Sequence, residues 1–428
     1  MESFLRGSIG LFLLVVLLFA LSTNRKAISW KLVFAAILMQ FMFALSILKI
    51  PQIASFFEVL STFFVVVLSF TKQGSSFLFG KILNVESNGF IFAFQILPTI
   101  IFFSALTSVL FYLGILQKIV YGLSWVLGRF LNISGPENLS ASANIFLGQT
   151  EAPLLIKPYL EGMTKSEIFC VMVGGMASSA GGVLAAYVGF LGGSDSGQQL
   201  FFAKHLLAAS VMSAPAAIAV SKILLPQDMK IDSTINLYKQ KSGSNLIEAI
   251  SIGTEDGLKL ALNVGSMLLV FIALIAMVNY ILGELIGGYS GLNFWVKQIS
   301  NGNFDRLSLQ FLLGYLCSPF VWALGVTDED MVSVGRLLGE KLILNEFVAY
   351  MSLGEMKAKA VFHDPKSLIM ATYILSGFAN FSSIGIQVGG IGSLAPSRKS
   401  LISELGIKAL IGGTICSLMT ATIIGMLS

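Results

Sequence analysis

The sequence predicts an all-α integral membrane protein with about eight transmembrane helices, two re-entrant hairpins in an inverted repeat, and interfacial helices. Hydrophobic residues form 55% of its 428 positions and charged residues only 12%, about half the charged fraction of a soluble domain. The apolar residues fall in runs that reach or approach the roughly 20 residues needed to span a bilayer. Lipid does not tolerate unpaired backbone, so we interpret these runs as helices.

The N-terminal unit, residues 1–116, is expected to supply mainly scaffold helices. Its predicted spans are 8–22, 28–48 and 92–116. The stretch 51–82 carries polar and charged residues among many Phe and Val, which favours an interfacial or obliquely packed helix. We interpret the first span as a retained helix with the N-terminus outside, because Arg25 and Lys26 follow it without a cleavage site.

An internal repeat organises the rest of the chain. Residues 163–189 and 364–390 both start near a Lys-Ser pair and run through about ten mostly apolar residues into a small, polar, glycine-containing stretch. Paired broken segments at matching positions of two halves indicate a binding site near the bilayer midplane of a secondary transporter. The alternative is a chance similarity between two membrane helices. Helix counting and the distribution of Lys and Arg favour an inverted repeat with both chain termini outside.

The repeat predicts the following organisation, in chain order. The first half is 117–225, with a hairpin at about 138–163 and a broken helix at about 165–190; a cytoplasmic linker follows at 226–256, with Lys230, Lys239 and Lys241; the second half is 257–428, with a scaffold helix at about 257–284, a hairpin at about 328–354, a broken helix at about 366–391 and a last helix at about 400–427.

Each predicted hairpin carries a carboxylate at its tip, within apolar sequence. The first tip is Gly148-Gln149-Thr150-Glu151, and the second is Asn345-Glu346. Ionisable residues at membrane depth are usually functional, so we expect Glu151 and Glu346 to face one shared wet cavity. The alternatives are a surface loop for the first tip, and an ion pair of Glu346 with Arg336 or Lys341 for the second.

The broken stretches contain Ser178-Ser179 in the first half and Asn380 with Ser382-Ser383 in the second. Small residues there also suit plain helix packing, but an amide in hydrocarbon needs polar partners. Unwound carbonyls with Asn and Ser oxygens form a hard, neutral set of ligands that suits Na⁺.

Four motifs in the chain resemble those of a known family. The runs Gly148–Pro153, Asn345–Tyr350, Ser376–Ser383 and Ala261–Gly265 are similar to motifs of the concentrative nucleoside transporters, in the family's order and spacing. The resemblance covers essentially the whole chain. It implies a multi-pass protein of a bacterial inner membrane and a homotrimer, with a scaffold and a mobile transport domain in each protomer. The hairpins and broken helices would belong to the transport domain.

The resemblance also implies site residues. The predicted nucleobase contacts are Gln149, Thr150, Glu151 and Val183; the predicted ribose contacts are Glu346, Asn380 and Ser383, with Phe378 packing nearby. The implied sodium ligands are the side chains of Asn144 and Ser178 and the carbonyls of Leu147, Ser178 and Ser179. The intact Gly-Gln-Thr-Glu tip favours Na⁺ over protons as the coupling ion, because the proton-coupled branch departs from it.

The function predicted from this is sodium-coupled nucleoside symport by an elevator-type mechanism, with a preference for pyrimidines such as uridine. One alternative is proton coupling, and another is an elevator-type sodium symporter for a different small polar solute. Two carboxylates at the tips disfavour an anionic solute. An intramembrane enzyme would need a metal cluster or a nucleophile–base pair, which the sequence does not suggest. The modest, scattered charge of +4 gives no indication of a nucleic-acid partner.

Overall fold

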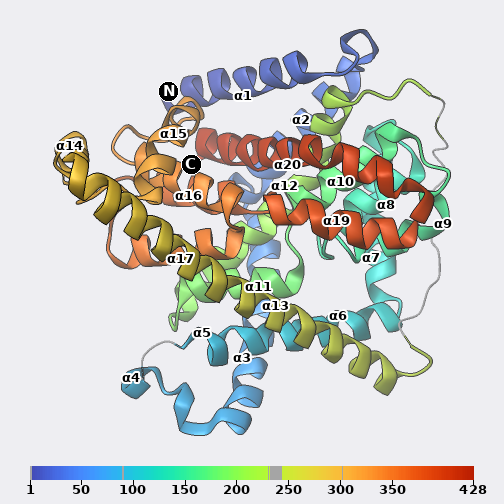
Figure 1. Cartoon of the computed structure of the whole chain (residues 1–428). Helices are drawn as coiled ribbons and strands as arrows, with labels where there is room; N and C mark the ends of the chain where they lie inside the picture. Colours follow the sequence, from blue (N-terminus) through green and yellow to red (C-terminus); the bar gives the residue numbers. More distant parts are fainter. Residues whose placement is uncertain (1, 89–90, 230, 232–242, 301) are drawn as a thin grey trace.

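The computed structural model describes residues 2–88, 91–229, 231, 243–300 and 302–428. All regular structure in these residues is helical (Figure 1). Eight of the described helical segments are long and apolar enough to cross a membrane. The predicted fold class is therefore confirmed. The linker residues Lys230, Lys239 and Lys241 lie outside the described residues.

The described residues before the first hairpin form seven α-helices. They are α1 (Glu2–Leu21), α2 (Trp30–Lys49), α3 (Pro51–Phe79), α4 (Val85–Asn88), α5 (Phe92–Gln95), α6 (Leu97–Tyr112) and α7 (Ile115–Phe130), with short 3₁₀ turns η1 (Arg25–Ala27) and η2 (Gly80–Leu83). The expected helix 92–116 is divided between α5 and α6, because Pro98 in the first turn of α6 cannot continue a preceding helix.

Helix α3 covers most of the stretch 51–82, for which the sequence favours an interfacial or obliquely packed helix. It has 29 residues, and an 18-residue window within Pro51–Leu83 reaches a mean hydropathy of 2.1, so the helix is long and apolar enough to be a candidate span as well. Within the helix, the Ser61 hydroxyl donates to the Phe57 carbonyl. Glu58 pairs with Lys204 at 3.1 Å. The interfacial or oblique placement of this helix stays a prediction.

The elements of the two halves follow in the same order. The first half contains α8 (Gly135–Ala143), η3 (Ala152–Ile156), α9 (Lys157–Leu160), α10 (Lys165–Ala177), α11 (Gly181–Gly192) and α12 (Ser196–Leu224). The second half contains α13 (Leu246–Tyr280), the π-helix η4 (Ile281–Gly288), α14 (Leu292–Ile299), α15 (Leu309–Ala323), α16 (Met331–Ile343), α17 (Glu346–Ala358), α18 (Pro365–Leu375), α19 (Phe381–Leu394), η5 (Pro396–Arg398) and α20 (Lys399–Leu427). Thus α8 to α12 correspond in order to α16 to α20.

Helix α13 begins at Leu246, inside the stretch 226–256 that the sequence pattern assigns to the linker. Its start is fixed by Asn245, whose side chain accepts a 2.9 Å hydrogen bond from the Glu248 amide. Such an N-cap satisfies a backbone donor that would otherwise lack a partner. The helix therefore begins well before the apolar run that predicts it.

Burial separates an inner group of helices from an outer one. In the best span windows of Lys165–Gly192 and Ser196–Leu224, 89% of residues are buried, against 17% for Leu246–Gly288. Figure 1 shows α13 running obliquely along the outside, beside α6, while α10, α12 and α20 lie within the molecule. The inner group contains the first broken helix, and the residues at both breaks, Ser178-Ser179 and Ser376–Asn380, are buried by protein.

Both broken helices stop because the backbone leaves the helical region at a serine. Ser178 ends α10 with φ −117° and ψ 165°, and Ser376 ends α18 with φ −62° and ψ 141°. The second break also contains Gly377 at φ +89°, a left-handed conformation that favours glycine. The chain becomes helical again at Gly181 and at Phe381. Each half therefore has a short unwound segment in the middle of a span.

Candidate functional site

A chain of hydrogen bonds connects the tips of the two hairpins. The Gln149 side-chain amide donates to the Ser383 hydroxyl at 3.3 Å. The Ser383 backbone amide donates to the Asn380 side-chain oxygen at 2.9 Å, and the Asn380 side-chain amide donates to the Glu346 carboxylate at 2.5 Å. All four side chains are buried. The structure thus brings together one predicted nucleobase contact and three predicted ribose contacts.

Two half-helices begin at this cluster. Asn345 caps α17 by accepting from the Val348 amide at 2.9 Å, and Asn380 caps α19. Glu346 is the first residue of α17. Helix N-termini carry partial positive charge and unpaired N–H groups, so a carboxylate at this position is stabilised by the helix as well as by Asn380.

The alternative ion pairs for Glu346 do not form. Arg336 pairs with Glu340 at 2.9 Å. The Lys341 ammonium donates to the carbonyls of Ile374 and Ser376 and to the Ser417 hydroxyl instead. The Glu346 carboxylate accepts from the neutral Asn380 amide. The Glu346 carboxylate is therefore positioned by a neutral donor and can accept a further hydrogen bond from a ligand hydroxyl.

At the first hairpin, the tip is turned into the protein instead of lying on its surface. Gly148 and Gln149 are buried, Glu151 is half-buried and Thr150 is exposed. The Glu151 carboxylate accepts from the Gly148 amide at 3.2 Å and closes the turn. The surface-loop alternative does not hold for Gln149. It is Gln149, and not Glu151, that connects this tip to the second half.

The remaining predicted contacts lie on the elements around the cluster. Val183, in the first turn of α11, is buried. Phe378 is buried in the second break. A Cβ added at Gly390 would lie 2.8 Å from Thr150 Cγ2, so Thr150 packs against α19. Their contact with a ligand stays a prediction.

The residues predicted to bind sodium lie in the segment that follows α8 and at the end of α10. Asn144 is buried, and neither its side-chain oxygen nor its nitrogen has a hydrogen-bond partner within the described residues. A Cβ added at Gly174 would lie 3.1 Å from Asn144 Nδ2, which places the amide against α10. Ser178 and Ser179, in the break of that helix, are buried too.

This donor set fits a sodium ion. A buried polar group without a partner costs about 1–3 kcal/mol, and a cation bound to the Asn144 oxygen would remove that cost. The carbonyl end of α10 also carries partial negative charge. Leu147, the last predicted ligand, precedes the hairpin tip and is buried. The ligands would be neutral oxygens, as Na⁺ prefers.

Sequence reasoning missed several buried polar residues beside the cluster. The Gln387 side chain, in α19, donates to the Met172 carbonyl of α10 at 2.9 Å. The rings of Tyr187 and Tyr350 stack with centroids 4.0 Å apart, and the Tyr350 hydroxyl donates to the Thr372 carbonyl at 2.7 Å. The sequence could have indicated Gln387, because an amide side chain within an apolar helix needs polar partners. It does not distinguish Tyr187 and Tyr350 from other tyrosines, because aromatic residues are common in membrane spans.

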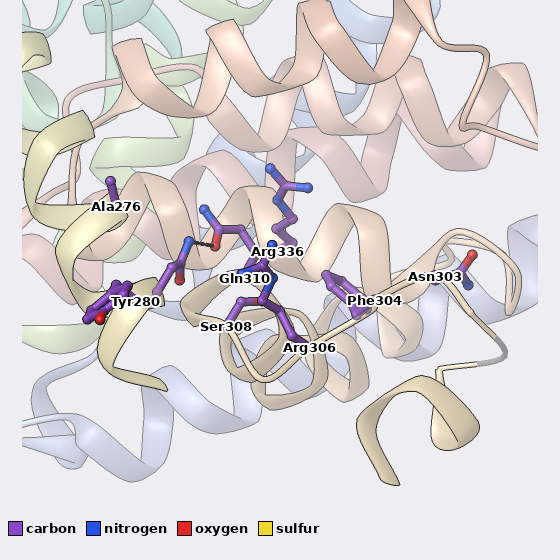
Figure 2. Close-up of a pocket in the computed structure, with 9 residues that line it drawn as sticks. Ala276, Tyr280, Asn303, Phe304, Arg306, Ser308, Gln310 and Arg336 are labelled. Carbon is purple, nitrogen blue, oxygen red and sulfur yellow. Dashed lines mark hydrogen bonds between the residues drawn. The ribbon is translucent and has the colours of Figure 1, made fainter. Parts of the chain in front are cut away.

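A cavity of about 550 Å³ lies elsewhere, between α13, α15 and α16. Figure 2 shows polar side chains such as Ser308 and Gln310 around it. The Asn279 side-chain amide donates to the Gln310 side-chain oxygen at 2.9 Å. Arg306 and Arg336 also line it. None of the predicted site residues does. We therefore do not assign substrate binding to this cavity.

Comparisons with known proteins agree with this geometry. Residues 205–425 match the family described as Na⁺ dependent nucleoside transporter C-terminus, residues 9–82 match the corresponding N-terminus, and residues 93–194 match the nucleoside-recognition Gate family. A transporter of Haemophilus influenzae is 40% identical over 99% of this chain and 98% of its own length. Sodium/nucleoside cotransporter 1 of Rattus norvegicus is 39% identical over 98% of this chain, which spans only 63% of that relative.

Solved structures give the same result. The structure of CNTnw in an inward-facing substrate-bound state matches with a TM-score of 0.88 at 36% identity, over 99% of this chain and 97% of that one. An intermediate state of a CNTnw variant matches with a TM-score of 0.90 at 36% identity, over 99% of both chains. The chain therefore belongs to the concentrative nucleoside transporter family, a family of Na⁺-dependent membrane transporters and not of enzymes.

Proposed function

We propose that this protein is a sodium-coupled symporter that imports nucleosides across a bacterial inner membrane, with uridine or a similar pyrimidine nucleoside as its preferred substrate. The observation that carries the proposal is the hydrogen-bond chain from Gln149 through Ser383 and Asn380 to Glu346. It sets amide and hydroxyl groups beside a buried carboxylate, which suits a neutral ligand rich in hydroxyl and amide groups.

In this proposal the second half binds the ribose. The Glu346 carboxylate accepts from the ribose hydroxyls, while Asn380 and Ser383 supply the complementary donors and acceptors. The first half reads the base, with Gln149, Thr150 and Glu151 at its polar edge and Val183 against its face. Phe378 packs beside the sugar. Two carboxylates near the ligand disfavour an anionic solute.

Sodium coupling follows from the position of Asn144. This residue lies at the start of the tip segment that ends with Gln149 and Glu151. Na⁺ bound to Asn144, Ser178 and the neighbouring carbonyls would hold the tip in the geometry that binds the nucleoside. Coupling requires only that each ligand prefer the same geometry. A mutual preference of 1–3 kcal/mol, about 5- to 150-fold in affinity, is typical.

We propose an elevator movement, in which the two hairpins and the two broken helices move together across the scaffold. The buried α10, α12 and α20 suit a compact moving unit, since most of their residues contact protein. The outer helix α13 exposes apolar side chains such as Leu262, Leu269 and Val270. Such a face suits lipid and a trimer interface, and we propose a homotrimer. We also propose that both termini lie outside.

Uptake of radiolabelled uridine into proteoliposomes tests the function. An inward Na⁺ gradient should drive accumulation, and excess unlabelled nucleoside should compete, whereas a dicarboxylate should not. Accumulation driven by a pH gradient without Na⁺ would favour proton coupling instead. Absence of nucleoside uptake under both gradients would contradict the proposal.

A further inference from the structure

A buried lysine occupies a distinctive position in the second half. Lys341 lies in α16, its side chain is fully buried, and it has no carboxylate within ion-pair distance among the described residues. Its ammonium group instead donates to the Ile374 carbonyl at 2.9 Å, the Ser376 carbonyl at 3.0 Å and the Ser417 hydroxyl at 3.0 Å. All three N–H donors of the ammonium therefore have neutral oxygen acceptors.

These acceptors lie at the C-terminal end of α18. Ile374 is in its last turn, and Ser376 is the residue that caps it. The last carbonyls of a helix lack partners within the helix and form the negative end of its dipole. A cation at this position is therefore stabilised by the half-helix, and Ser417 of α20 completes the set of ligands.

The corresponding place in the first half is the end of α10. Ser178 caps α10 as Ser376 caps α18, and both serines have extended backbone. Asn144, which follows the first arm of its hairpin, approaches α10 as Lys341 in the other hairpin approaches α18. The two positions therefore correspond in the order of elements and in the helix end that they face.

The two positions differ in charge. Residues 131–156, which contain the first hairpin tip, include no Lys or Arg. At the end of α10, the Ser178 hydroxyl donates to the Gly174 carbonyl at 3.0 Å, and within the described residues no charged side chain donates to the carbonyls of residues 174–178. At the end of α18, side chains of Tyr350, Lys341 and Ser376 all donate to carbonyls. The negative end of α18 thus contacts a cation that belongs to the protein, the Lys341 ammonium. The negative end of α10 contacts no charged side chain of the described residues, so a cation from solution can bind there.

We propose that the Lys341 ammonium is a covalently attached counterpart of the coupling ion, occupying in the second half the place that Na⁺ takes in the first. It fixes the break at α18 permanently, so the ribose residues on α17 and α19 need no ion to be ordered. The protein then takes a cation from solution only at Asn144, and one Na⁺ is bound per protomer. This inference rests on the sodium site proposed above.

The test counts ions by thermal unfolding of the purified full-length protein in detergent. NaCl replaces choline chloride at constant ionic strength, and the dependence of unfolding free energy on ln[Na⁺] gives the number of ions bound on folding. The wild type should show a slope for one ion. Lys341→Ser leaves a hydroxyl and space among the same carbonyls, so it should melt at a lower temperature in choline and show a slope for two ions.

Two controls separate charge from space. Lys341→Met keeps the stem but removes the charge and leaves no room for an ion, so its melting temperature should fall while the slope remains that of one ion. Lys222 is the other buried lysine in the described part of the chain. It pairs with Glu137 and donates to Ser166, away from either break. Lys222→Ser should therefore also keep the slope of one ion.

A second measurement keeps the inference testable even if Lys341→Ser fails to fold. With Lys341 intact, Asn144→Leu should lose all Na⁺-dependent stabilisation, because the other place is already filled. A residual one-ion slope in Asn144→Leu would overturn the inference, and so would a one-ion slope in folded Lys341→Ser. A wild type that Na⁺ does not stabilise would contradict the sodium site itself, which is a different outcome.

Discussion

The Gln149 side-chain amide lies 3.3 Å from the Ser383 hydroxyl, so residues 234 positions apart connect the first hairpin tip to the second broken helix. Each comes from a different half of the repeat. Any ligand that binds between the hairpin tips therefore touches both halves. Movement of one half against the other would change the contacts of that ligand. The hydrogen bond between Gln149 and Ser383 joins the two halves directly.

Glu346→Gln should reduce Na⁺-driven uridine uptake by about 10- to 100-fold, because a hydrogen bond to a charged acceptor contributes roughly 1.5–3 kcal/mol. The melting temperature should change little, since Gln keeps an oxygen for the 2.5 Å bond from Asn380. Glu284→Gln serves as a control, because Glu284 is exposed and pairs with Arg306 at the surface. Near-normal uptake by Glu346→Gln would refute the ribose assignment.

Asn144→Leu should stop uptake driven by Na⁺ without destabilising the protein in choline. The Asn144 amide has no partner within the described residues, so an apolar side chain of similar size removes an uncompensated buried group. Melting in choline chloride should therefore occur at or above the wild-type temperature. A large fall in melting temperature without Na⁺ would mean that Asn144 has a structural role instead.

Gly377→Ala should destabilise the protein by about 2 kcal/mol or more. Gly377 has φ +89°, and an added Cβ would lie 2.6 Å from the Ala177 carbonyl oxygen, where the two breaks meet. Its amide also donates to the Ser179 hydroxyl at 3.0 Å. Gly389→Ala in α19 is the matched control, since its added Cβ meets no atom within 4 Å. Chemical unfolding in detergent should show a loss only for Gly377→Ala.

Asp330, in the loop before α16, should make stability depend on acid pH. Burial raises the pKa of its carboxyl, but hydrogen bonds from the backbone amides of His363 and Asp364 outweigh burial and lower the pKa below its usual value. Stability from these bonds is present above the unfolded pKa of about 3.9 and is lost as the pH falls through the folded value.

Melting temperatures measured from pH 7 down to pH 3 check this prediction. The wild type should lose stability over the acid part of that range. Asp330→Asn should be less stable at pH 7 and should show a flatter curve. Glu329→Gln is the control, because the amides of His363 and Asp364 donate to Asp330 and not to its neighbour Glu329. Parallel curves for wild type and Asp330→Asn would contradict the role given to Asp330.

The sequence was sufficient for the features that depend on local pattern. Run length and hydropathy predicted the helical membrane fold. Small and polar residues within apolar runs predicted breaks at Ser178–Gly182 and Phe378–Ser383, and the observed breaks begin at Ser178 and, two residues earlier than predicted, at Ser376. Hairpin tips at Glu151 and Glu346 followed from polar residues flanked by segments too short to span the membrane. These patterns are readable because backbone polar groups in lipid must be satisfied within a segment or face protein.

Only the tertiary structure decided which side chains meet. Gln149, and not Glu151, donates a hydrogen bond to the second half, and Glu346 accepts from Asn380 and not from Lys341. Gln387 of α19 donates to a carbonyl of α10. All of these contacts join residues that are far apart in sequence. Local hydropathy does not predict such contacts, because a polar residue within an apolar run looks the same in the sequence whichever partner it has in the structure. The partner is fixed only when the helices pack.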